Sequence, residues 1–183
     1  AVNDQGKTLI GEKGIEQNTG KIVYITTNKR FPAIPEVIGA LKSAHGMIFG
    51  PGSLYTSIIP NILADGVPEA IASNPCRKVY IANIMTQMGE TLCMSLSEHV
   101  SEIERYLGSP LDDLVVNSEE IPDTLMKRYA EQRAEPVKID SAAVHRRLLI
   151  EKLLKLVVDD RDQLLKVRHD EIKLAAIIKR IFS

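Results

Sequence analysis

The sequence has 183 residues, 44% hydrophobic and 26% charged, which fits a single globular domain with an apolar core. Its formal net charge is −1, and only 4% of its residues are aromatic, with no Trp. These values argue against nucleic-acid binding, which relies on a basic surface and on aromatic stacking, so any recognition of phosphate has to be local.

The first half of the chain predicts strands that alternate with helices. Residues 21–26 are β-branched and aromatic, which favours a strand, whereas Pro35 suits the first turn of a helix. Pro60 removes a backbone donor and should kink or divide the helix in which it lies. The expected elements are a strand at 21–26, a helix at 35–43, a strand at 47–49, helices at 53–64 and 67–72, and a buried strand at 78–83.

The second half continues this alternation. Val100, Ile103 and Leu107 recur at helical spacing, and Ser97 precedes them as the expected N-cap. Pro136 would confine the segment that it opens to a sheet edge. The expected elements are a helix at 97–107, strands at 114–116 and 136–139, a helix at 122–132, and a helical C-terminal portion at 141–183 that ends in a helix at 171–182. The fold class is α/β, a Rossmann-like, mainly parallel sheet with flanking helices in one domain, 1–183.

Two glycines and three hydroxyl residues follow the strand at 47–49. Gly50 and Gly52 permit a close approach of the backbone, while Ser53, Thr56 and Ser57 supply hydroxyls at the start of a helix. The free amides of a helix N-terminus favour an anion, which predicts a phosphate site at this turn. A tight strand-to-helix turn in which Ser53 merely caps the helix explains the same residues, and the spacing alone does not separate the two.

A second polar segment, 83–91, follows the strand at 78–83. Asn83, Thr86 and Gln87 both donate and accept hydrogen bonds, as a sugar hydroxyl or a base edge requires. Glu90 could accept from a sugar hydroxyl or act as a general base; alternatively, the loop only satisfies its own backbone. A third polar segment, 117–120, follows the strand at 114–116, and parallel strands bring all three segments to one sheet edge. Asp112 and Asp113 lie at the opposite edge and are expected in a solvated turn.

Few other residues carry a chemical signal. Arg168 precedes the last helix and is a candidate anion contact, or it belongs with His169 to a helix-terminal charge group beside Asp170. His99 is expected to be a surface or packing residue. No catalytic residue and no metal ligand are assigned. The candidate ligand-binding residues are Gly50, Pro51, Gly52, Ser53, Thr56, Ser57, Asn83, Thr86, Gln87, Gly89, Glu90, Thr91 and Arg168.

The two cysteines and the hydropathy of the chain bear on its location. Cys76 and Cys93 lack metal-ligand spacing. One disulfide between them is an alternative, but free thiols in a reducing compartment are expected. No apolar run approaches the roughly 20 residues that a membrane-spanning helix needs. We therefore expect a cytoplasmic protein that does not insert into membranes.

Four stretches together resemble one known family. These are Gly50–Asn61, Lys78–Gln87, Gly89–Thr91 and Arg168–Asp170. In order and spacing they resemble the bacterial gluconeogenesis-factor (YvcK-like) proteins, which are relatives of the CofD-like 2-phospho-L-lactate transferases. The resemblance implies that this chain is the C-terminal part of a larger CofD-like fold and lacks the N-terminal nucleotide-binding segment of the family.

The resemblance also implies a function. It suggests a regulatory protein that binds a nucleotide sugar such as UDP-N-acetylglucosamine and supports cell shape and wall-precursor supply during growth on gluconeogenic carbon. It favours a role for Arg168 at the ligand. No cofactor is expected for such a regulator. An alternative is a transferase that uses Mg²⁺ to move a phosphate-linked group to a hydroxyl acceptor. A further alternative is a non-catalytic interaction module, and a homodimer fits the apolar tail at 148–158.

Overall fold

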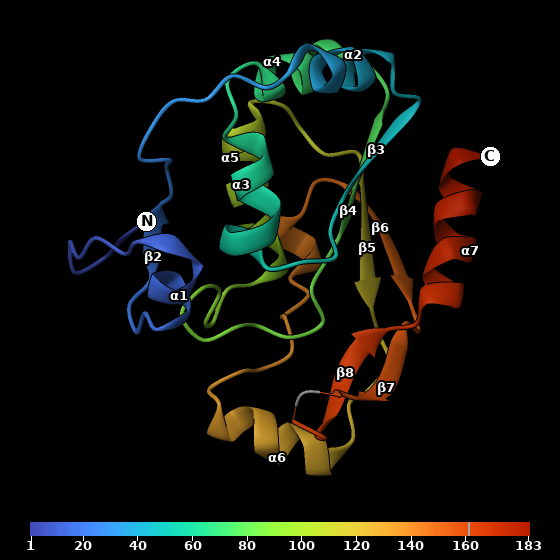
Figure 1. The fold of residues 1–183 in the computed structure, drawn as a ribbon. Helices are drawn as coiled ribbons and strands as arrows, with labels where there is room; N and C mark the ends of the chain where they lie inside the picture. The colour runs from blue at the N-terminus through green and yellow to red at the C-terminus, as the bar shows by residue number, and fades with distance from the viewer. Residues whose placement is uncertain (161) are drawn as a thin grey trace.

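The computed structural model describes residues 1–160 and 162–183, and its centre is a four-stranded parallel sheet (Figure 1). The strand order in this sheet is β3-β4-β5-β6, so each strand pairs with the next one along the chain. This arrangement confirms the predicted α/β class with a mainly parallel sheet. The elements are β1 (Val2–Asn3), α1 (Gly11–Glu16), β2 (Ile22–Tyr24), α2 (Pro35–Ser43), β3 (Gly46–Phe49), the π-helical turn η1 (Leu54–Ile58), α3 (Ile59–Ile62), α4 (Val67–Ser73), β4 (Arg77–Ile81), α5 (Leu96–Leu107), β5 (Asp113–Asn117), α6 (Asp123–Glu131), the 3-10 turn η2 (Ser141–Ala143), β6 (Arg147–Glu151), β7 (Leu154–Val158), β8 (Leu165–His169) and α7 (Glu171–Phe182).

The sheet is covered on both faces, and the side chains of its strands alternate between the two. Val79 and Ile81 of β4 pack with Val115 of β5 against Ile177 and Ile181 of α7. The intervening side chains belong to the larger cluster on the other face, where α3 and α5 lie (Figure 1). Each face therefore has its own apolar contacts, which explains why β4 reads as a continuous apolar run.

The predicted strand at 21–26 does not join the parallel sheet. It forms the shorter β2, which pairs antiparallel with β1 in a separate two-stranded sheet. Ile22 and Ile25 are buried, whereas Val23 and Tyr24 are nearly half exposed. A strand whose side chains are largely exposed suits a surface ribbon rather than the interior of a parallel sheet.

Pro60 divides its helix, as its chemistry predicts. The π-helical turn η1 ends at Ile58, and Pro60 lies in the first turn of α3, where its missing N–H costs no hydrogen bond. The helices expected at 35–43 and 67–72 correspond to α2 and α4. The chain therefore leaves β3 through one irregular turn that ends in a well-packed helix.

The N-cap of α5 is Ser95, so the prediction of Ser97 is wrong. The Ser95 hydroxyl accepts from the amide of Glu98, and the Glu98 carboxylate accepts from the amide of Ser95. Ser97 instead hydrogen-bonds Asp140 through its amide and its hydroxyl. The sequence signal was available, since Glu98 stands three residues after Ser95.

The strand predicted at 136–139 is also absent from the described elements. Pro136 forms only an isolated bridge with Met85, and the amide of Val137 donates to the carbonyl of Ile84. The carbonyl of Lys138 accepts from the amide of Leu96 at the start of α5. The backbone of this segment therefore bonds to the loop after β4 and to the start of α5 rather than to a strand of the sheet.

The described residues of the C-terminal region form strands as well as a helix, which corrects the expected helical portion at 141–183. It contains β6, which extends the sheet beside β5, and an antiparallel ribbon of β7 and β8, before α7. In β6, Leu149 is buried and Ile150 is half exposed, the alternation of a strand. The final helix alone was predicted correctly, at 171–182.

Asp113 is not in a solvated turn, as the sequence had suggested. It begins β5 and is 2% exposed, 3.5 Å from Arg77 Nε and 3.7 Å from Arg147 Nη1. The Asp112 carboxylate accepts from the amide of Lys78. Both residues therefore join neighbouring strands at the amino edge of the sheet, where β4, β5 and β6 begin.

His99 of α5 is fully buried, which makes the stability of the fold depend on pH. Its Nδ1 lies 2.8 Å from the carbonyl oxygen of Ser95, an acceptor, so Nδ1 carries the proton. Within the described residues its Nε2 has no hydrogen-bond partner. Burial lowers the pKa of His99, although the carbonyl of Ser95 and the charge of Glu98 oppose the shift.

We expect the free energy of unfolding to fall as the pH drops below about 6.5, since the unfolded state then binds the additional proton. In His99→Gln this loss should be smaller by up to about 1.4 kcal/mol per pH unit. Urea unfolding between pH 7.5 and 5.5 measures both slopes. His45→Gln, at an exposed position, is the control. Equal slopes for His99→Gln and the unaltered chain would refute the assignment.

Two further features concern the chain as a whole. Within the described residues, none of the helices combines the length and apolar character of a membrane span. Cys76 and Cys93 are free thiols, which agrees with the expectation for these two residues.

Candidate functional site

The largest concentration of predicted site residues lines a cavity of about 780 Å³ at the carboxyl ends of β3 and β4. Pro51, Gly52 and Ser53 approach it from the turn after β3, and the segment 83–88 approaches it from β4. Arg168 of β8 lies on the same lining. The structure thus brings together, from three distant stretches, residues that the sequence selects separately. The remaining lining comes from α6, the segment after it, the β7–β8 turn, β8 and α7.

The conformation of the turn after β3 is fixed by contacts with β4 and with the polar segment that follows β4. Gly50 has φ +88°, and a Cβ there would lie 2.8 Å from the carbonyl oxygen of Ile81 in β4. The glycine therefore permits the close approach of two strands. Ser53 precedes η1 without a side-chain capping bond; its Oγ accepts from Gln87 Nε2 at 2.9 Å. This bond ties the two polar segments together on the cavity wall, so the capping explanation of Ser53 is wrong.

Glu90 occupies the N-terminus of η1, the position where the sequence predicts an external anion. Its Oε2 accepts from the amide of Tyr55 at 2.9 Å, and its Oε1 accepts from Thr56 Oγ1 at 2.8 Å. Glu90 is 5% exposed, and this burial raises its pKa, although the hydrogen bonds from Thr56 and Tyr55 oppose the shift. A carboxylate of the chain itself thus binds at this helix end.

Several other predicted residues make their polar contacts within the loop, and most of them do not line the cavity. Thr86 and Thr91 are buried, and their hydroxyls accept from the amides of Glu135 and Gln87, respectively. Gly89 has φ +85°, and a Cβ there would lie 2.6 Å from the backbone oxygens of Ile15 and Glu16. Thr86 still contributes to the cavity lining, whereas the described lining omits Gly50, Thr56, Ser57, Gly89, Glu90 and Thr91.

The wall opposite the Gly-Pro-Gly turn is rich in cations. Lys166 is held by Asp159 and Asp162, with Nζ to carboxylate-oxygen distances of 3.1 and 2.6 Å. Arg168 lies 3.5 Å from Asp159, and 55% of its side chain is exposed. Arg128 of α6 donates to the carbonyl of Leu165. Because its guanidinium has five donors and is partly exposed, Arg168 is the cation best placed to meet an anionic ligand.

His169 and Tyr129 complete this wall. His169 Nε2 lies 3.2 Å from the carbonyl oxygen of Ala82 at the end of β4. Burial lowers the pKa of His169, although this carbonyl opposes the shift. The hydroxyl of Tyr129 accepts from the amide of Val167 at 3.0 Å. These two contacts fix β8 to the parallel sheet and to α6, so the cavity has walls from separate parts of the chain.

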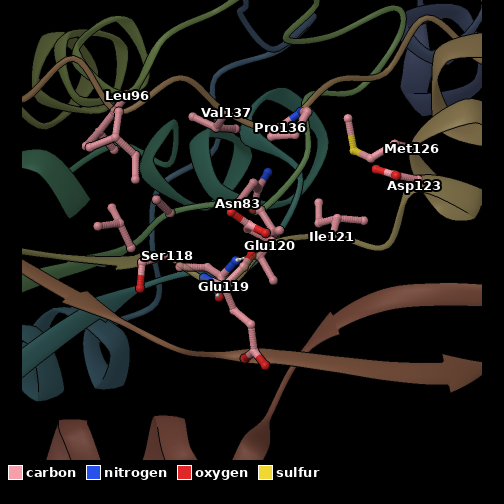
Figure 2. Close-up of a pocket in the computed structure, with 15 residues that line it drawn as sticks. Asn83, Leu96, Ser118, Glu119, Glu120, Ile121, Asp123, Met126, Pro136 and Val137 are labelled. Atoms are coloured by element: carbon pink, nitrogen blue, oxygen red, sulfur yellow. Dashed lines mark hydrogen bonds between the residues drawn. The ribbon is translucent and has the colours of Figure 1, made fainter.

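The third polar segment lines a different, adjoining cavity of about 480 Å³ (Figure 2). Ser118, Glu119 and Glu120 contribute to it from the end of β5. Asn83 and Ile84 line both cavities, so the end of β4 forms their common wall. The expected convergence of three segments therefore produces two neighbouring hollows instead of one.

Sequence reasoning missed most of the cationic wall. Arg128 and Tyr129 lie on α6, which reads only as a polar helix, and nothing in their spacing points to a distant loop. Lys166 and Arg168 alternate along β8, a signal that could have been used if the segment had been recognised as a strand. His169 follows Arg168 directly in the sequence, but no local pattern distinguishes it as a wall residue.

Comparisons with known proteins agree with this architecture. A family model described as 2-phospho-L-lactate transferase CofD matches residues 1–157. A putative gluconeogenesis factor of Thermotoga maritima is 42% identical over 178 residues, covering 97% of this chain and 57% of the relative. The gluconeogenesis factor of Bacillus subtilis is 36% identical, covering 96% of this chain and 55% of the length of that relative.

A crystal structure of a UPF0052 family protein from Bacillus halodurans is also similar, with a TM-score of 0.85 and 34% identity over 97% of this chain and 56% of that one. This chain therefore spans a little over half the length of the relatives that it matches. Because the family model covers most of the chain and both relatives exceed 30% identity over nearly all of it, the chain belongs to the CofD family, alongside the members called gluconeogenesis factors.

Proposed function

We propose that this chain provides a phosphate-recognising wall of a nucleotide-sugar site in a regulatory protein, with UDP-N-acetylglucosamine as the representative ligand. One observation carries the proposal: the Gly-Pro-Gly turn, the segment 83–88 and Arg168 line a single cavity of about 780 Å³. Cavities of this size accommodate ligands of several hundred Å³, the scale of a nucleotide sugar. The location at the carboxyl ends of parallel strands is the usual ligand position in open α/β sheets.

The charges of the cavity support an anionic ligand. Arg128, Lys166 and Arg168 line it together with two carboxylates, Asp162 and Glu171. The carboxylate of Asp162 pairs with Lys166 and that of Glu171 with Lys155, so neither is an uncompensated charge. The donors of Arg168 can meet a phosphate in a charge-assisted, bidentate arrangement, and Ser53 and Gln87 offer neutral hydrogen bonds nearby. The ligand would thus be held by one cation and several polar groups.

The names of the relatives supply the biological setting of this proposal. Two relatives are called gluconeogenesis factors. We extend this to the present chain as a role in growth on gluconeogenic carbon, with nucleotide-sugar binding linking carbon supply to wall precursors and cell shape. The description of the family model favours a second candidate, a transferase that moves a phosphate-linked group to a hydroxyl acceptor. Release of a nucleotide product that depends on Mg²⁺ would favour the transferase.

Arg168→Ala tests the proposed ligand contact. We expect it to weaken binding of UDP-N-acetylglucosamine by about 10- to 100-fold, the usual range for losing a hydrogen bond to a charged partner. Isothermal titration calorimetry on the full natural chain measures this change. Arg30→Ala is the matched control, because Arg30 is exposed, pairs only with Asp65 among the described carboxylates, and lies outside the described lining of this cavity.

The two possible failures are distinct. Absence of binding by the unaltered protein at millimolar ligand would rule out the nucleotide-sugar proposal itself. Unchanged affinity in Arg168→Ala, with binding by the unaltered protein intact, would remove only the role assigned to Arg168.

A further inference from the structure

The adjoining cavity of about 480 Å³ has a composition unlike that of the first. Its inner lining is apolar and includes Leu96, Val116, Ile121, Met126 and Val137. Its polar side chains are carboxylates, amides and the hydroxyl of Ser118, and the lining within the described residues contains no Lys or Arg. In the view of Figure 2, Asn83 and Glu120 lie at the centre of the cavity, with Ile121, Asp123 and Met126 to one side. The two cavities thus differ in charge although they share a wall.

The acidic side chains of this cavity differ in their availability. Glu119 is engaged by the chain: its Oε2 accepts from the amide of Leu154 at 3.2 Å and lies 3.6 Å from Lys173 Nζ. Glu120 and Asp123 are exposed and form no hydrogen bond or ion pair with any described residue. Their carboxylates are free to accept hydrogen bonds from a ligand. An apolar surface flanked by carboxylates and amides suits a pyranose, which offers C–H faces and several hydroxyl donors.

Asn83 links the two cavities. It follows β4, lines both hollows, and can both donate and accept hydrogen bonds through its side-chain amide. A ligand that extends past Asn83 would therefore enter a basic region on one side and an acidic, partly apolar region on the other. Phosphate oxygens are repelled by Glu120 and Asp123, whereas uncharged hydroxyls are attracted by them, so only one orientation is favourable.

We propose that the second cavity is the glycosyl subsite of the ligand whose phosphates occupy the first, with Glu120 and Asp123 accepting hydrogen bonds from its hydroxyls. This inference rests on the nucleotide-sugar function proposed above and adds the residues that distinguish a nucleotide sugar from a nucleoside diphosphate. It defines the ligand class as a diphosphate ester of an uncharged, polyhydroxy ring.

The test compares two probes, UDP and UDP-N-acetylglucosamine, by calorimetry on the full natural chain. In Glu120→Ala and Asp123→Ala we expect UDP-N-acetylglucosamine to bind about 5- to 10-fold more weakly in each variant, while the affinity for UDP changes less than twofold. Glu131→Ala is the matched control, because it removes an exposed carboxylate of α6 outside the described lining. Thermal unfolding midpoints near that of the unaltered chain establish that each variant is folded.

Three other outcomes are decisive. If the unaltered protein binds neither probe, the nucleotide-sugar function fails and the subsite falls with it. If UDP binds but the sugar brings no gain in affinity, the subsite is wrong while a nucleotide site stands. If both substitutions weaken UDP and UDP-N-acetylglucosamine equally, the two carboxylates act on the whole site and the glycosyl assignment is overturned.

Discussion

Gly89→Ala is expected to lower the free energy of unfolding by more than about 3 kcal/mol. The backbone of Gly89 is left-handed, with φ +85°, a conformation that alone costs an alanine about 1 to 2 kcal/mol. The added Cβ would also lie 2.6 Å from the carbonyl oxygens of Ile15 and Glu16. Both contacts are with backbone, which cannot rotate away, so the segments must separate. Urea unfolding at neutral pH measures the loss.

The control for this substitution is Gly108→Ala, since Gly108 is also left-handed, with φ +63°, at the C-terminus of α5. A Cβ there would meet no atom within 4 Å. We expect a cost of about 1 to 2 kcal/mol, from conformation alone. Equal losses in the two variants would contradict the close approach of the Gly89 loop to α1.

Glu90→Ala is expected to cost about 2 kcal/mol of stability. It leaves the buried amide of Tyr55 without its acceptor, and an unsatisfied buried donor costs about 1 to 3 kcal/mol. The hydroxyl of Thr56 loses the same acceptor, but Thr56 is only half-buried, so water can replace much of that bond. Burial of the Glu90 carboxylate is itself unfavourable, as its raised pKa indicates, and removing the carboxylate offsets part of the lost stability. Since the folded-state pKa is the higher one, the contribution of Glu90 is greatest below pH 4.5 and declines as the pH rises through the folded-state value.

Glu90→Gln separates the structural role of Glu90, as acceptor for Tyr55 and Thr56, from a role in ligand binding. Its single amide oxygen can serve one of the two donors, so we expect a loss between that of Glu90→Ala and zero. Glu12→Ala, an exposed residue of α1, is the control and should lie within about 0.5 kcal/mol of the unaltered chain. If Glu90→Ala unfolds as the unaltered chain does but loses all ligand affinity, the carboxylate binds ligand and the structural role is wrong.

These two residues illustrate what the sequence could predict. A glycine and a carboxylate after a buried strand indicate that the loop needs an unusual backbone conformation and a hydrogen-bond acceptor. The identity of the partner depends on contacts between segments far apart in the chain: Glu90 reaches η1, 35 residues away in the case of Tyr55. Local patterns therefore located the loop correctly but could not tell an internal partner from an external one.

Helices were predicted well where a local signal fixes the first turn. Pro35 begins α2, and Asp170 caps α7 by accepting from the amides of Ile172 and Lys173, so the starts of both helices follow from the sequence. The β7–β8 ribbon was missed because its dense apolar and basic residues fit either structure. The pairing of β7 with β8 depends on the register between the two strands. The sequence pattern of either strand alone does not reveal that pairing. The cationic wall of the cavity was not predicted for the same reason, because Lys166 and Arg168 belong to β8.

The order of the parallel strands has a consequence for how the chain folds. Because β3, β4, β5 and β6 lie side by side in the order of synthesis, each new strand finds its partner already present as the chain leaves the ribosome. No strand has to wait for a distant one or be inserted between two others, which keeps the loop-closure cost of each step small. The sheet can therefore grow by one crossover at a time, with every new strand added on the side away from β3.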